Sequence, residues 1–129
     1  MAAELRKILY IEDEPDIQTI AKLSLEQVGG FEVCICSSGA EGLEKIKTYH
    51  PDLILLDVMM PGMDGPTTLA ELKKNPALKK IPMVFMTAKA QPQEIEQFKR
   101  LGVVDVITKP FDPVGLPTLV RKIWMSAVG

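Results

Sequence analysis

The sequence predicts an α/β fold in which one doubly wound, five-stranded parallel sheet has helices on both faces. Two observations lead to this fold class. Short apolar segments with many β-branched residues recur at spacings of about 20 to 30 residues, which suits buried strands. The stretches between them carry apolar residues at helical spacing. Strands that alternate with helices build a parallel sheet with right-handed crossovers.

The strands follow from the apolar segments taken in chain order. We predict five of them: Lys7 to Ile11, Phe31 to Cys36, Leu53 to Leu56, Met83 to Met86, and Val104 to Ile107. Three of the intervening helices show their apolar stripe most clearly. Its members are Ile17, Ile20, Ala21, Ser24 and Val28 in the first, Ile95, Phe98 and Leu101 in the second, and Leu116, Leu119, Val120, Ile123 and Trp124 in the last.

Start and stop signals agree with these helices. Ser38 and Glu41 have the spacing of a capping box, in which each side chain satisfies a free backbone amide at a helix start. Pro66 and Pro92 suit the first turn of a helix, and Gly102 follows a helical stretch. The register of strands and helices is therefore marked at several independent points.

Length and charge limit the class of protein. The 129 residues fit one domain spanning 1–129, and fifteen basic against seventeen acidic residues leave a net charge of −2. This balance gives no reason to expect nucleic acid or an anionic membrane as a direct partner. No apolar stretch is long enough to span a membrane, and the first residues do not resemble a signal peptide, so we expect a cytoplasmic protein.

Cysteine and histidine do not predict a zinc site. Cys34 and Cys36 lie two apart in an apolar strand, so both side chains share one face and are interpreted as core thiols. A C-x-C pair could supply two metal ligands, but no second pair exists, and His50 falls in a loop elsewhere.

Polar side chains end four of the five predicted strands. They are Glu12 and Asp13, Asp57, Thr87, and Lys109. In open parallel sheets, ligands bind outside the carboxyl ends of the strands. Three carboxylates at adjacent strand ends repel one another unless a cation lies between them. Because all the available ligands are hard oxygens, Mg²⁺ or Mn²⁺ is favoured.

The same set of residues suits phosphoryl transfer. Asp57 can act as a nucleophile that forms an aspartyl phosphate, Lys109 can neutralise a phosphate oxygen, and Thr87 can donate its hydroxyl to another. Taken singly, each residue has an ordinary explanation; Asp13 or Glu14, for example, could cap the helix that contains Pro15. The combination at one sheet edge favours the functional interpretation.

Four segments, IEDEPD, LILLDVMMPGMDG, VFMTAKA and VVDVITKPF, resemble the signatures of the bacterial two-component response-regulator receiver family. The resemblance extends along the chain and is to single-domain, chemotaxis-type receivers. It implies the flavodoxin-like strand order 2-1-3-4-5. It also implies a phosphorylation switch that is not an enzyme, beyond accepting its own phosphoryl group and losing it slowly.

The resemblance assigns roles to single residues. It makes Glu12 and Asp13 the acidic metal pair, Asp57 the phosphoacceptor and a metal ligand, and Met59 a ligand through its backbone carbonyl. Thr87 and Lys109 match the hydroxyl and lysine of the family, and the Lys109-Pro110 bond would be cis.

The implied partners are a sensor histidine kinase or a histidine phosphotransfer protein, and a downstream target on the surface of the fourth helix, fifth strand and fifth helix. Two residues depart from the family pattern. Glu12 stands where an Asp is frequent, and Val106 stands where many relatives have a Tyr or Phe that rotates on activation.

Three alternatives remain from the residues. An aspartate-nucleophile phosphatase of the haloacid-dehalogenase type typically needs a D-x-D pair, whereas Val58 and Met59 follow Asp57. A flavin or nucleotide binder would need a glycine-rich phosphate loop, and the first turn here is acidic. A receiver that works without phosphate, as an interaction module alone, is the third.

Overall fold

Five parallel strands form one sheet in the computed structural model, which describes residues 4–88 and 90–128. The strands are β1 (Lys7–Ile11), β2 (Glu32–Cys36), β3 (Leu53–Asp57), β4 (Met83–Thr87) and β5 (Asp105–Thr108). Their spatial order is β2-β1-β3-β4-β5. The fold class and strand order that the sequence predicts are confirmed, and each predicted strand lies within one or two residues of an observed one.

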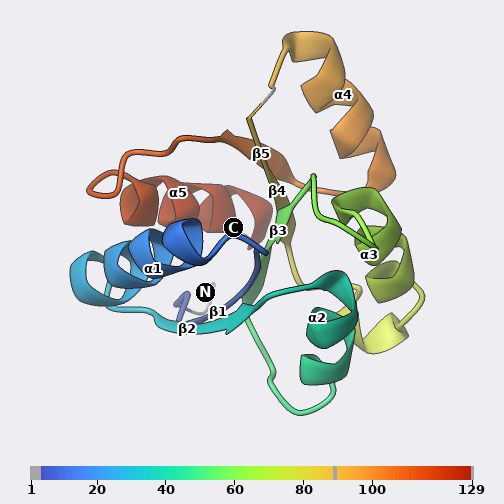
Figure 1. Ribbon diagram of the computed structural model, residues 1–129, viewed down its shortest axis with the longest axis horizontal. Coiled ribbons are helices and arrows are strands. Elements are labelled where there is room, and N and C mark those ends of the chain that lie inside the picture. The colour runs from blue at the N-terminus through green and yellow to red at the C-terminus, as the bar shows by residue number, and fades with distance from the viewer. Residues whose placement is uncertain (1–3, 89, 129) are drawn as a thin grey trace.

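Helices cover both faces of this sheet. They are α1 (Pro15–Leu23), which continues into a π-helical turn (Ser24–Val28), α2 (Gly39–Lys45), α3 (Gly65–Lys73), α4 (Pro92–Leu101) and α5 (Leu116–Val128). A 3₁₀ turn spans Pro76–Leu78. Figure 1 shows α1 and α5 on one side of the sheet and α2 and α3 on the other, while α4 extends away from the body.

The alternation of side chains along each strand divides the core in two. Tyr10, Leu55 and Met86 belong to the cluster beneath α1 and α5, with Trp124 from α5. Leu9, Ile11, Leu56 and Phe85 belong to the cluster beneath α2 and α3. Because every residue of β3 and β4 is buried, these two strands form the rigid centre from which Asp57 and Thr87 emerge.

The helix starts carry the expected chemistry. The amide of Glu41 donates to Ser38 Oγ at 3.1 Å, which confirms Ser38 as the N-cap. The return hydrogen bond differs from the predicted capping box, because Glu41 Oε2 accepts at 3.1 Å from the amide of Ser37, one residue before the N-cap. Pro66 and Pro92 both lie in the first turn of their helices.

Helix α4 is only loosely attached to the sheet. None of its ten residues is buried. The Phe98 ring meets the Phe85 ring of β4 edge-on, with 5.0 Å between the ring centroids and 86° between the planes. This aromatic contact on the sheet is the clearest anchor of a helix that stands away from the core (Figure 1).

In the part of the chain that the structure describes, no helix has both the length and the apolar character needed to cross a membrane.

Candidate functional site

The predicted polar residues meet at the carboxyl edge of the sheet. Glu12 and Asp13 follow β1, Asp57 and Thr87 are the last residues of β3 and β4, and Lys109 follows β5. One carboxylate oxygen from each of the three acids lies within 4.8 Å of the other two. The parallel sheet thus brings together residues that lie far apart in the sequence, such as Glu12 and Lys109, which are 97 positions apart.

Lys109 joins two of the carboxylates. Its ammonium donates to Asp57 Oδ1 at 3.0 Å and to Glu12 Oε1 at 3.1 Å. Both acids are buried, with Asp57 2% and Glu12 0% exposed. Burial lowers the pKa of Lys109, but its hydrogen bonds to Asp57 and Glu12 outweigh burial, so the pKa lies above its usual value.

Asp57 is held in an unfavourable environment for a charge. Burial raises its pKa to about 6, an effect that the nearby charge of Glu12 reinforces and the hydrogen bond from Lys109 opposes. The carboxylate is therefore mostly ionised at neutral pH, although its charge is not fully compensated. A second cation beside Asp57 would compensate the remaining negative charge.

The carboxylate of Glu12 is fully engaged within the protein. Oε1 accepts from the Tyr10 hydroxyl at 3.2 Å as well as from Lys109, and Oε2 accepts from the Glu14 amide at 3.2 Å. Tyr10 is a site residue that the sequence does not predict. The signal that could have found it is its position two residues before Glu12, on the same face of the strand.

Asp13 contrasts with its neighbour. Its Oδ1 is buried and has no hydrogen-bond partner among residues 4–88 and 90–128. A buried acceptor without a partner is costly, and Asp13 is one of the three acids whose carboxylate oxygens gather within 4.8 Å of one another. The N-cap of α1 is Glu14, which makes no side-chain cap, and so the capping alternative for Asp13 and Glu14 is not what the structure shows. This donor set fits a hard divalent cation.

A hollow of ≈ 240 Å³ opens above Asp57. Thr87, Ala88, Lys109 and Met59 are among the residues that line it. Met59, one of these residues, is 78% exposed. Ala88, next to Thr87, also lines the hollow, and its small side chain leaves space beside that residue.

Gly65 allows the loop after β3 to close beneath the site. A Cβ at this position would lie 2.5 Å from the carbonyl oxygen of Asp57 and 2.7 Å from Val58 Cα. Only glycine fits so close to another backbone segment. The start of α3 is therefore pressed against the end of β3, which fixes the segment that carries Asp57 and Met59.

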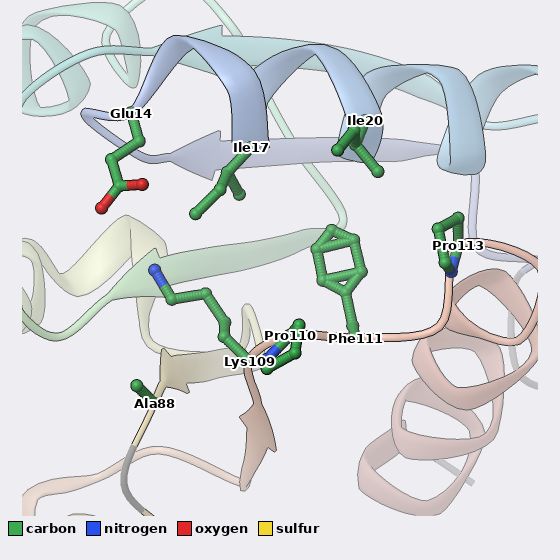
Figure 2. Close-up of a pocket in the computed structure, with 8 residues that line it drawn as sticks. All are labelled: Glu14, Ile17, Ile20, Ala88, Lys109, Pro110, Phe111 and Pro113. Carbon is green, nitrogen blue, oxygen red and sulfur yellow. The ribbon is translucent and has the colours of Figure 1, made fainter.

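A second, apolar cavity of ≈ 390 Å³ adjoins the site on the α1 side. Figure 2 shows Ile17 and Ile20 of α1 facing Phe111 and Pro113, with the Lys109 ammonium at one end near Glu14. Ile20 belongs to the predicted apolar stripe of its helix, but 45% of this residue is exposed. No pattern in the sequence distinguishes a groove-lining isoleucine from a core one.

Comparisons with known proteins now identify the family. The response regulator receiver domain matches residues 8–121 of this chain. The chain belongs to the response regulator receiver family. The Lys109-Pro110 bond, which the resemblance implies to be cis, is cis in this receiver.

Relatives of known identity include two-component regulators. The probable C4-dicarboxylate response regulator DctR of Priestia megaterium is 38% identical over 105 residues, which are 81% of this chain and 45% of that protein. The alkaline phosphatase synthesis transcriptional regulatory protein PhoP of Bacillus subtilis is 36% identical over 118 residues, 92% of this chain and 48% of that protein. The receiver thus spans about half the length of these curated relatives.

Solved structures share the whole fold. The chemotaxis response regulator CheY4 of Vibrio cholerae superposes with a TM-score of 0.85 at 26% identity, covering 92% of this chain and 98% of that one. A putative response regulator from Chloroflexus aurantiacus gives 0.84 at 29% identity, covering 95% and 99%. The receiver is therefore a module of two-component signalling, a class whose members are typically not catalysts in their own right.

Proposed function

We propose that this receiver is a phosphorylation switch that accepts a phosphoryl group on Asp57 from a histidine kinase or a histidine phosphotransfer protein. One observation carries the proposal. The Asp57 carboxylate lies in a three-acid cluster, 3.0 Å from the Lys109 ammonium, at the floor of an open hollow. Nucleophile, neutralising cation and room for the phosphoryl group are thus combined in one place.

The transfer can be written from the residues present. A carboxylate oxygen of Asp57 attacks the phosphorus of a phosphohistidine, the new O–P bond forms as the P–N bond breaks, and the bonding electrons remain on the imidazole nitrogen. Lys109 neutralises negative charge on a phosphoryl oxygen. Thr87, at the end of β4, offers its hydroxyl to a second phosphoryl oxygen.

Mg²⁺ suits the acidic residues beside Asp57. When bound, it supplies positive charge that offsets both the carboxylates and the phosphoryl oxygens. The residues that would hold it are Asp13 and Asp57 directly, Met59 through its backbone carbonyl, and Glu12 through water. The partnerless Oδ1 of Asp13 and the full engagement of Glu12 support this division.

The partner surfaces follow from exposure. The apolar cavity between α1 and the segment after β5 ends at Lys109, so a phosphodonor that packed on Ile17, Ile20 and Phe111 would bring its histidine to the site. The downstream target is expected on α4, β5 and α5, because no residue of α4 is buried and its surface is open to a partner. This receiver would do both in the cytoplasm, without direct contact with nucleic acid or membrane.

The geometry disfavours the phosphatase alternative. In that class a second acid two residues after the nucleophile acts on the leaving group. Met59 occupies this position here, and its side chain is exposed and apolar. A module that works without phosphate would have no use for buried, mutually repelling carboxylates, because their charges cost stability.

The test is phosphorylation with a small-molecule phosphodonor in the presence of Mg²⁺, followed by intact-mass measurement. We expect one phosphoryl adduct in the native protein and none in Asp57→Asn. Asp52→Asn is the matched control, since Asp52 lies just before the same strand and accepts only from the backbone amides of Arg6 and Lys7 among the described residues. An undiminished adduct in Asp57→Asn would refute the assignment.

A further inference from the structure

A buried tyrosine lies directly beneath the acidic cluster. Tyr10 is 0% exposed, and its hydroxyl donates to Glu12 Oε1 at 3.2 Å. That same oxygen accepts from the Lys109 ammonium, which in turn reaches Asp57 Oδ1. A continuous hydrogen-bonded chain therefore runs from Tyr10 through Glu12 and Lys109 to the phosphoacceptor.

The strand explains why these two side chains meet. Tyr10 and Glu12 are two residues apart, so both point to the α1 and α5 face of the sheet. Glu is one methylene longer than Asp. A longer side chain has more rotamers, so its carboxylate can occupy more positions unless hydrogen bonds fix it. The two donors on Oε1 and the Glu14 amide on Oε2 hold the carboxylate of Glu12 in one orientation.

We propose that Tyr10 is a positioning residue for the phosphoacceptor site, holding the Glu12 carboxylate beside Lys109 and out of direct competition with Asp13. This inference rests on the proposed function, because the reaction that it serves is phosphoryl transfer to Asp57. In this role Tyr10 acts through Glu12, the acid to which its hydroxyl donates.

The chemistry of the hydroxyl suits this task. Burial raises the pKa of Tyr10, and the negative charge of Glu12 raises it further, so the hydroxyl stays protonated and remains a donor at any physiological pH. A hydrogen bond to a charged, buried acceptor is among the stronger ones in proteins. Tyr10 thus fixes an acid that is longer than the one frequent in the family.

The experiment is a double-mutant cycle of Tyr10→Phe and Glu12→Asp. The phenylalanine keeps the ring in the core and removes only the hydroxyl. The Asp side chain is too short to reach the Tyr10 hydroxyl, so it removes the same hydrogen bond from the other side. Tyr49→Phe is the matched control, because the Tyr49 hydroxyl contacts the Glu32 carbonyl at 3.4 Å, away from the site.

Two readouts are measured in each variant: the Mg²⁺ dissociation constant by amide chemical shifts, and the rate constant of phosphorylation by a small-molecule donor. We expect Tyr10→Phe to weaken Mg²⁺ binding and slow phosphorylation by about fivefold each. In the Glu12→Asp background the same change should alter either value by less than about twofold, and Tyr49→Phe should alter neither.

Two results would overturn the positioning role: unchanged values in Tyr10→Phe, or an equal loss in both backgrounds, which indicates a merely structural tyrosine. Urea unfolding of the metal-free proteins separates this question from the proposed function. In these unfolding measurements, Tyr10→Phe should lower the free energy of unfolding more in the native background than in the Glu12→Asp background. This expectation holds whether or not Asp57 accepts phosphate. Failure of the native protein to take up phosphate would instead count against the proposed function.

Discussion

Lys109 and the buried Asp57 form an ion pair, with 3.0 Å between the ammonium and Oδ1, at the floor of the hollow where the phosphoryl group is expected. The same ammonium also neutralises Glu12 at 3.1 Å. Lys109 is thus the countercharge of the metal-free site as well as the proposed partner of the phosphoryl group. Its removal affects stability and signalling in ways that can be measured separately.

We predict that Lys109→Ala lowers the stability of the metal-free protein by about 3 kcal/mol, because it leaves two buried carboxylates without their cation. Mg²⁺ should restore more stability to this variant than to the native protein, since it replaces the missing charge. Urea unfolding with EDTA and with Mg²⁺ checks both statements. Equal Mg²⁺ stabilisation of the two proteins would contradict the shared-charge interpretation.

The raised pKa of Asp57 predicts a pH-dependent stability. Its pKa is about 6 in the folded protein and near 3.9 in an unfolded chain. Between these values the folded state binds more protons, so the contribution of Asp57 destabilises the fold increasingly as pH rises from about 4 to 6 and is constant above that range.

Asp57→Asn should therefore make the metal-free protein more stable at pH 7, by about 1 to 3 kcal/mol. The advantage should shrink as pH falls from 6 to 4, as urea unfolding in EDTA at several pH values would show. Asp16→Asn, on the exposed side of α1, controls for general charge effects. A constant advantage across this range would exclude Asp57 as the titrating group.

Asp13 and Glu12 should contribute unequally to metal binding. We predict that Asp13→Asn weakens Mg²⁺ binding about a hundredfold, because Oδ1 is the buried oxygen without a partner. Glu12→Gln should weaken it by about tenfold or less, because Glu12 is already occupied by Tyr10, Lys109 and the Glu14 amide. Isothermal titration with Mg²⁺ measures both, and similar affinities for the two variants would remove Asp13 from direct coordination.

Much of the site could be predicted because a parallel sheet places the carboxyl ends of all its strands at one edge. The apolar runs locate the strands, and Asp57 and Thr87 stand at the ends of two of them. Their proximity therefore follows from the strand positions alone. The N-cap at Ser38 is equally predictable, because its hydrogen bond joins residues only three apart.

Other features depend on contacts between distant segments, which no local pattern encodes. The groove beside Ile20 exists because the chain after Lys109 runs alongside α1 at Phe111 and Pro113. The looseness of α4 could not be foreseen either, since its apolar stripe of Ile95, Phe98 and Leu101 is typical of a packed helix. In the structure, Leu101 is 53% exposed.

Two residues near the site, Val106 and Phe98, differ in how they could carry a signal away from it. Val106 is half-buried on β5 and has no ring that could swing between the core and solvent. Phe98 offers another route. It lines the same hollow as Asp57 and Thr87, and its ring packs edge-on against Phe85 of the rigid β4. A movement of Thr87 and Ala88 toward a phosphoryl group would therefore reach α4 through this ring.

We predict that Phe98→Leu keeps phosphorylation of Asp57 within about twofold but uncouples α4 from it. The loss of the aromatic pair should cost about 1 kcal/mol of stability, so the fold survives. Amide chemical shifts with a beryllofluoride phosphate mimic provide the measurement. In the native protein we expect changes across residues 90–108, and in Phe98→Leu we expect them to stay near Asp57 and Thr87.

Ile95→Val, on the same helix but outside the residues that line the hollow, should behave like the native protein. Undiminished changes along α4 in Phe98→Leu would exclude the ring as the route, because phosphate can shift α4 only through contacts that differ between its two positions.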